Sequence, residues 1–141
     1  SSNKQLVTSI NMAKIESYKE LLIWQKSMDL TTDIYTVTAS FPKSQQYGLT
    51  SQMQRAALSI CSNIAEGHNR RYTKEFLYFL RIAQGSLAEL ETQILLSQRV
   101  AYATTDPEDT LISQTQSLGK MRTAMAKKLS QKILPKCRGV R

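Results

Sequence analysis

Two groups of basic residues in this sequence could bind the phosphates of a nucleic acid. Arg70 and Arg71 lie in a short basic turn, and a C-terminal segment with no acid after Asp109 carries Lys120, Arg122, Lys127, Lys128 and Lys132. Lysine and arginine contacts to phosphates hold a nucleic acid without reading its bases, so such binding weakens steeply as salt rises. A solvated basic segment without a ligand is the alternative that charge alone leaves open.

The carboxylates give less support for chemistry. Glu66 and Glu89 fall in two predicted helices, but the single histidine, His68, is not part of the Glu-x-x-His pattern that di-iron bundles use. The chain also lacks a glycine-rich phosphate loop. We therefore expect no catalytic residue, no metal site and no cofactor. A carboxylate buried between helices needs a partner, and we interpret the following residues as a structural polar network: Arg55, Asn63, Glu66 and Glu89.

Length and composition indicate one soluble domain. A chain of 141 residues buries roughly two thirds of its unfolded surface, so a core forms without staples. Cys61 and Cys137 form no Cys-x-x-Cys pair, and we interpret both as free thiols in a reducing compartment. No segment reaches the roughly 18 apolar residues of a membrane span, and the N-terminus lacks the apolar block of a signal peptide. We expect a cytoplasmic protein with no membrane partner.

The spacing of apolar residues predicts the helices that would position these side chains. Apolar residues recur three and four apart, as on one stripe of a helix, over residues 19–40, 52–67 and 76–96 and again from Pro107 to about Lys132. No segment alternates as a strand would. The sequence predicts an all-α protein, an antiparallel up-down-up-down four-helix bundle over residues 19–133. A flexible N-terminal segment, residues 1–18, would precede it, and a basic C-terminal tail, residues 134–141, would follow.

Local signals predict where these helices begin and end. Gly67 would end the second helix in the left-handed conformation, Thr73 would cap the third, and Asp106 with Pro107 would start the fourth. The third helix carries apolar residues well beyond its seam, among them Tyr78 and Ile82. Either this helix is central to the monomer or a second copy of the protein covers it.

The stretch Gln52-Met-Gln-Arg-Ala-Ala-Leu-Ser-Ile-Cys-Ser-Asn-Ile-Ala-Glu-Gly67 resembles the signature of the four helix bundle protein family. Members of that family are encoded in intervening sequences of bacterial 23S ribosomal RNA genes, and the family is related to the accessory variability protein of diversity-generating retroelements. Further matches, such as Trp24-Gln-Lys and Gly85-Ser-Leu-Ala-Glu-Leu-Glu91, extend the resemblance over residues 20–102. Relatives often have proline at the place of Cys61 and a basic residue at that of Gln54.

The resemblance implies a homopentamer with a basic surface that binds nucleic acid or assists a reverse transcriptase. Together with the basic residues, it predicts a non-enzymatic oligomeric protein that binds RNA or DNA with weak sequence preference. The alternative is an accessory protein that binds a retroelement reverse transcriptase and its template. The surrounding genes would separate the two, since one reading requires a ribosomal RNA operon and the other an adjacent reverse transcriptase.

Overall fold

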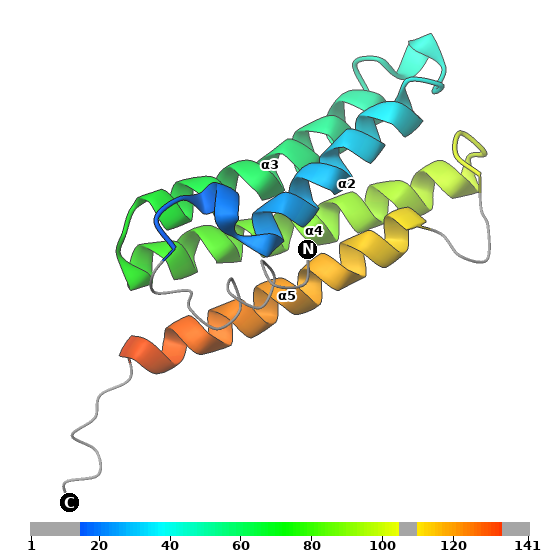
Figure 1. Ribbon diagram of the computed structural model, residues 1–141. Helices are drawn as coiled ribbons and strands as arrows, with labels where there is room; N and C mark the ends of the chain where they lie inside the picture. The colour runs from blue at the N-terminus through cyan, green and yellow to red at the C-terminus, as the bar shows by residue number, and fades with distance from the viewer. Residues whose placement is uncertain (1–14, 105–109, 134–141) are drawn as a thin grey trace, which may run out of the picture.

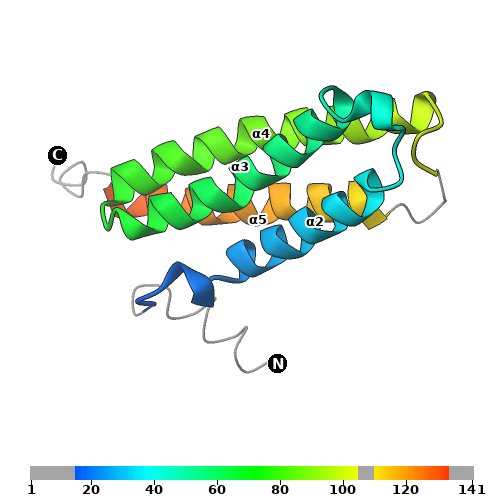
Figure 2. The same cartoon turned by 90° about the horizontal axis from the view of Figure 1, so that it is seen from above.

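The computed structural model describes residues 15–104 and 110–133, in which four long helices pack side by side (Figure 1). In chain order the elements are η2 (Tyr18–Glu20), α2 (Leu22–Thr38), η3 (Lys43–Gln45), α3 (Leu49–Asn69), α4 (Thr73–Arg99) and α5 (Thr110–Ile133). Consecutive long helices run in opposite directions, and α2 and α4 each pack against both α3 and α5 (Figure 2). The predicted all-α, antiparallel four-helix bundle is confirmed, and the described residues include no strand.

The core consists of the apolar stripes that the sequence spacing indicates. The predicted seam of α4 is buried throughout, at Phe76, Leu80, Ala83, Leu87, Leu90 and Ile94. Leu30 of α2, Ile60 of α3 and Leu118 of α5 belong to the same cluster. Each large apolar side chain that is fully buried contributes roughly 1.5–3 kcal/mol to stability, so this one cluster supplies the main driving force for folding.

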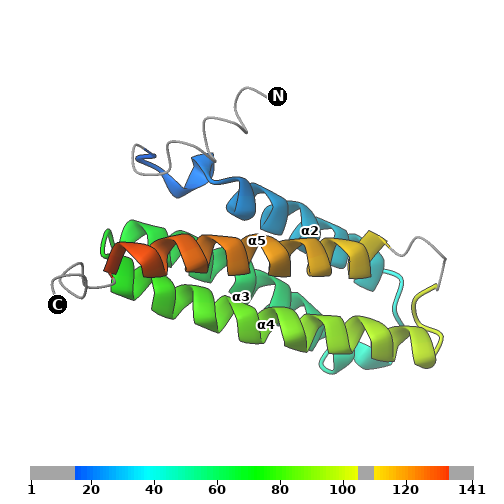
Figure 3. The same cartoon turned by 90° about the horizontal axis from the view of Figure 1, so that it is seen from below.

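Polar contacts connect α2 to its two neighbours. The Thr31 hydroxyl donates to the carbonyl of Ser27 at 2.8 Å and lies 3.2 Å from the carbonyl of Ala57 in α3, while Gln114 of α5 donates to the Asp33 carboxylate at 2.9 Å. Figure 3 shows α2 inclined to α5, and this pair has the least extensive contact of the four neighbouring pairs. Cys61 is a buried free thiol, as predicted; Cys137 lies outside the described residues.

The end of α3 differs from the prediction, because Gly67 does not terminate the helix. It lies inside α3, which continues to Asn69, and no glycine of the described residues has a positive φ. A Cβ added at Gly67 would lie 2.8 Å from Cβ of Phe79 and 2.9 Å from a ring carbon of Phe76. The glycine is therefore required by the close approach of α3 and α4. The left-handed residue that follows α3 is Arg71, with φ of 69°.

The helix starts also differ in detail from the prediction. Tyr72, not Thr73, occupies the N-cap position of α4, and its side chain makes no capping hydrogen bond. Before α2, Ser17 and Glu20 form a capping box around η2, and Ile15 is buried in the core, so packing begins within the predicted N-terminal segment. The predicted cap at Asp106 and Pro107, the remainder of that segment and the basic tail lie outside the described residues.

Candidate nucleic-acid interface

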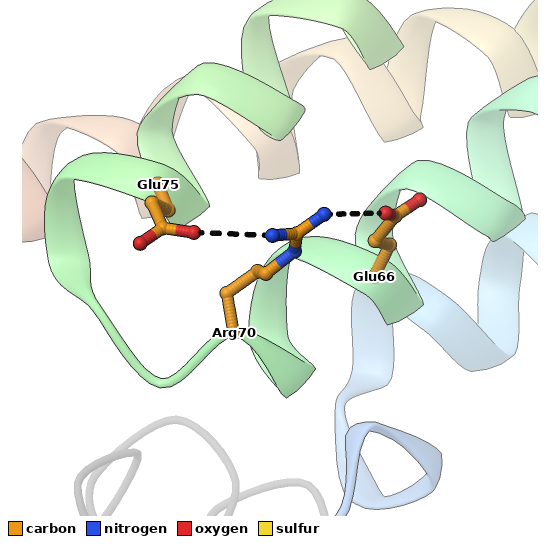
Figure 4. Close-up of polar contacts among 3 residues, drawn as sticks. All are labelled: Glu66, Arg70 and Glu75. Carbon is orange, nitrogen blue, oxygen red and sulfur yellow. Dashed lines mark hydrogen bonds and ion pairs between the residues drawn. The ribbon is translucent and has the colours of Figure 1, made fainter.

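The first predicted phosphate ligand, Arg70, is held between two acids in the turn from α3 to α4 (Figure 4). Its Nη2 lies 3.0 Å from Oε2 of Glu66, and its Nη1 lies 3.6 Å from Oε1 of Glu75. The guanidinium carbon is also 5.2 Å from the ring centroid of Phe79. These contacts connect the end of α3 to the start of α4 and offset the charge of Arg70. The side chain is therefore a weak candidate for binding phosphate.

Arg71 and Lys132 meet at one end of the bundle although 60 residues separate them in sequence. Both line a cavity of about 280 Å³, which also involves the end of α3 and the start of α4. The Arg71 guanidinium donates from Nη2 to the carbonyl of Glu16 at 3.0 Å. His68 lines the same cavity. Burial and, secondly, the charge of Arg71 lower the pKa of His68, while a hydrogen bond to the Ile15 backbone and the charge of Glu20 act in the opposite direction.

The remaining predicted cations of α5 point in different directions around the helix. Lys120 and Lys127 are exposed and seven residues apart, so they share one face. Lys128 lies about 100° further around the helix, one turn before Lys132. Arg122 falls near the buried stripe and is only partly exposed. Burial lowers the pKa of its guanidinium, which donates to the Thr123 hydroxyl at 3.2 Å. The seven predicted cations therefore do not form a single patch.

Two basic residues that sequence reasoning did not select extend the face of Lys120 and Lys127. Lys74 and Arg81 of α4 are exposed and seven residues apart, so they also lie on one face of their helix. Helix α5 runs antiparallel beside α4, and Gln116 donates to Glu91 across this pair at 3.4 Å. Because the two helices are antiparallel, this pairing places Arg81 of α4 nearly opposite Lys127 of α5 along the bundle axis. We call Lys74, Arg81, Lys120 and Lys127 the α4–α5 basic face.

The polar contacts between α3 and α4 differ from the network predicted at Arg55, Asn63, Glu66 and Glu89. The hydroxyls of Ser59 and Ser86 are 2.7 Å apart across the two helices, and the Asn63 amide donates to the carbonyl of Ser59 at 2.7 Å. Arg55, Glu66 and Glu89 are exposed, and Glu66 pairs with Arg70. Because these carboxylates are exposed, they need no buried partner. The polar contact between α3 and α4 is therefore made by the small hydroxyl side chains of Ser59 and Ser86.

Two further findings concern metal ligands and membrane-spanning helices. Within residues 15–104 and 110–133, no three His, Cys, Asp or Glu side chains are grouped as metal ligands would be. None of the helices there combines the length and the apolar character needed to cross a membrane.

Comparison with known proteins assigns the chain to a family. The profile of the 23S rRNA-intervening sequence protein family matches residues 19–124, which is most of the chain. The chain belongs to this family. The resemblance seen in the signature from Gln52 to Gly67 is thereby confirmed, and the match includes Lys74, Arg81 and Lys120 but ends before Lys127.

A solved structure supports the family fold. A protein of unknown function from the S23 ribosomal protein family of Bacteroides thetaiotaomicron is similar to this chain with a TM-score of 0.67 and 21% sequence identity. The similarity covers 75% of this chain and 99% of that one. At this identity the likeness concerns the fold. No functionally curated protein matches the sequence.

Proposed function

We propose that this family member is a non-enzymatic protein that binds RNA or DNA through the α4–α5 basic face. The observation that carries the proposal is the alignment of exposed cations on two adjacent helices: Lys74 and Arg81 on α4, and Lys120 and Lys127 on α5. The family's association with ribosomal RNA genes and the net charge of +8 support a polyanionic partner. The contacts would be to phosphates, so sequence preference would be weak.

The spacing of these cations suits a polymer better than a small anion. Seven helical residues span about 10.5 Å along the axis, so the two cations on each helix are too widely spaced to surround one phosphate. Two parallel rows of this kind instead follow an extended chain of charges. Lys132 and Arg71 lie at the same end of the bundle as Lys74, but Lys132 follows Lys127 by five residues and so faces about 140° away from it around α5. Arg70 and Arg122 are excluded because an ion pair engages the first and burial the second.

Self-assembly would strengthen such binding. Tyr78 and Ile82 are one turn apart on one face of α4, and Leu96 lies on the same face about 21 Å further along the helix; each is at least 36% exposed. An exposed group of large apolar residues indicates a surface covered by another molecule. We propose that a second copy of the chain covers it in a homo-oligomer, for which the family resemblance implies five copies. Each copy would then add one basic face to a shared binding surface.

A titration against salt tests the proposed binding. Fluorescence anisotropy of labelled RNA and DNA, each in two unrelated sequences, is measured from about 50 to 300 mM salt. We expect affinity to fall linearly on a log–log plot, with similar values for the two sequences. Replacing Arg81 and Lys127 by glutamine removes two phosphate contacts and should lower the slope by about 1.4–1.8, because each contact accounts for roughly 0.7–0.9.

A matched variant controls for the loss of charge. Lys26 of α2 and Lys43 of η3 are exposed lysines outside the basic face, and replacing both by glutamine removes the same net charge. This variant should retain most of the wild-type slope. Absence of binding at low salt, an affinity that does not move with salt, or equal losses in the two double variants would overturn the proposal.

A further inference from the structure

The cavity at the end of the bundle has a lining suited to an anion. It lies where the C-terminal end of α3, the N-terminal end of α4 and the C-terminal end of α5 meet. Arg71 and Lys132 supply positive charge, and Ile15, Phe76 and Leu129 supply an apolar wall. None of the described residues that line the cavity is acidic. The two cations therefore face a shared space with no carboxylate in its lining.

Arg71 is held at this cavity by a hydrogen bond. Its φ of 69° lies in the left-handed region, which is unfavourable for a side chain as large as arginine. The hydrogen bond from Nη2 to the carbonyl of Glu16 fixes one edge of the guanidinium. A guanidinium has five N–H donors in a planar fork, so further donors remain for a ligand. Arg71 directly follows the C-cap residue of α3, where a left-handed residue is the usual end of a helix, so the hydrogen bond to Glu16 is what positions its cation.

The start of α4 contributes a second source of positive potential. This helix is 27 residues long, and the Tyr72 side chain at its N-cap position makes no capping hydrogen bond. The first N–H groups of a helix have no acceptor within the helix, and together with the helix dipole they attract anions. Thr73, the first residue of α4, lines the cavity. The cavity thus brings the N-terminus of α4 together with two cationic side chains, which also offset the negative dipole ends of α3 and α5 that border it.

His68 supplies a polar atom that would gain a partner. Its Nδ1 is buried and has no hydrogen-bond partner among the described residues, although the ring lines the cavity. Buried polar atoms in proteins usually have a partner, from the protein or from a ligand or water. When protonated, Nδ1 would donate to an oxyanion in the cavity. Tyr72 lies at the rim with 68% of its surface exposed, where its ring could stack on a nucleobase.

We propose that this end cavity binds a phosphate monoester, with Arg71 and Lys132 as its charged ligands. A monoester carries a charge of about −1.5 to −2 at pH 7 and three acceptor oxygens, which match two cations and a helix N-terminus better than the single charge of a backbone diester. The phosphate could belong to the end of a nucleic-acid strand or to a free nucleotide. Only the first source rests on the proposed nucleic-acid binding. The phosphate site itself stands independently of it.

Oligonucleotides with different ends distinguish these sources. The full chain is titrated with strands of one sequence that end in a 5′-phosphate, a 3′-phosphate or hydroxyl groups only, and separately with a nucleoside monophosphate and inorganic phosphate. We expect at least one phosphate-ended strand to bind roughly tenfold more tightly than the hydroxyl-ended strand, as a charge-assisted contact of this kind provides. Because His68 is the only histidine, its ring resonance in the NMR spectrum reports directly on the cavity. It should shift when inorganic phosphate is added.

Substitutions at the two charged ligands test the assignment. Lys132→Gln should abolish the preference for phosphate ends, and Arg71→Asn should do the same while retaining a residue that tolerates the left-handed conformation. Thermal unfolding of each variant verifies that it folds. Lys127→Gln is the matched control on α5: it should weaken binding of all strands by the same factor, leaving the preference unchanged.

The outcomes separate this inference from the proposed function. Salt-dependent binding of all strands with no preference, together with an unmoved His68 resonance, would overturn the phosphate site and leave the basic face intact. A shifted resonance without affinity for any strand would support a site for a free phosphate monoester and contradict the proposed nucleic-acid binding. A preference for phosphate ends that survives both Lys132→Gln and Arg71→Asn would also overturn the assignment.

Discussion

Gly67 illustrates how a missing side chain sets the distance between two helices. The space beside it is filled by Phe76 and Phe79 of α4, so an alanine there would force α3 and α4 apart or displace a ring. Overpacking of this kind typically costs about 1–3 kcal/mol, against which alanine gains up to about 1 kcal/mol in helix propensity. We expect Gly67→Ala to lower the free energy of unfolding by about 1–2 kcal/mol, measured by urea denaturation.

Gly85 provides the matched control for this substitution. It lies inside α4 and is exposed, and apart from the adjacent residues and backbone of its own helix no atom lies within 4 Å of an added Cβ. Gly85→Ala should therefore raise the free energy of unfolding by about 0.5–1 kcal/mol through helix propensity alone. If both variants changed stability in the same direction, close packing at Gly67 would not be the reason for its glycine.

His68 predicts how the stability of the protein depends on pH. Burial and the neighbouring Arg71 lower its pKa below the ordinary value of 6.5, while the Ile15 carbonyl and Glu20 act in the opposite direction. The unfolded chain therefore binds a proton at a higher pH than the folded protein does. Stability contributed by the neutral ring is present above about pH 6.5 and is lost as the pH falls toward the folded-state pKa.

Urea denaturation at pH 5.5 and pH 7.5 measures this contribution. The wild-type protein should be less stable at the lower pH, and His68→Gln, which cannot titrate, should show a smaller difference between the two. Glu20→Gln serves as a comparison, because it removes the acid that favours the charged ring. It should enlarge the loss at low pH. A His68→Gln variant with the full wild-type pH dependence would assign the effect to other groups.

At the scale of elements, the sequence predicted which segments are helices but not how their charges are sorted. The seam from Phe76 to Ile94 was predictable because each buried position follows the last by three or four residues. The cations of α4 do not stand out in the linear sequence, because Glu75, Glu89 and Glu91 lie among them. Each residue turns the helix by about 100°, so Lys74 and Arg81 share a face from which Glu75 points away. Reading charge around the helix would have found them.

Contacts between elements explain the other differences. The proposed phosphate ligands, Arg71 and Lys132, line one cavity only because α5 returns antiparallel to the start of α4, and no local pattern encodes that pairing. Arg70 and Arg71 are adjacent in sequence and equivalent by charge. The structure distinguishes them, because Glu66 and Glu75 engage Arg70, whereas Arg71 lines the cavity and donates to the carbonyl of Glu16. The role of Gly67 likewise depends on Phe76 and Phe79, which belong to the next helix.

At the scale of the whole molecule, the basic and apolar surfaces adjoin on α4, because Tyr78 is four residues from Lys74 and three from Arg81. Lys74 and Arg81 face the side shared with α5, whereas Ile82 follows Arg81 by one residue and turns toward the side shared with α3. A copy of the chain centred on Ile82, at the α3 side, would leave the α5 part of the basic face, Lys120 and Lys127, open. Closed symmetry repeats one interface around a ring, so the basic faces would repeat with it. Several weak phosphate-binding faces held together bind a long polyanion more tightly than one does.

Light scattering of the purified protein tests this arrangement. One chain has a mass of 16.0 kDa, so the five copies implied by the family resemblance would give about 80 kDa. Substituting aspartate for Ile82 and Leu96 places two charges in the apolar surface, and burial of an unpaired charge is costly enough to dissociate an interface of this kind. We expect the double variant to have the mass of a monomer and to lose affinity for long RNA more than for short RNA. Met28→Asp, at an exposed apolar residue of α2, should leave the mass unchanged. A monomeric wild-type protein, or dissociation by Met28→Asp alone, would contradict the proposed interface.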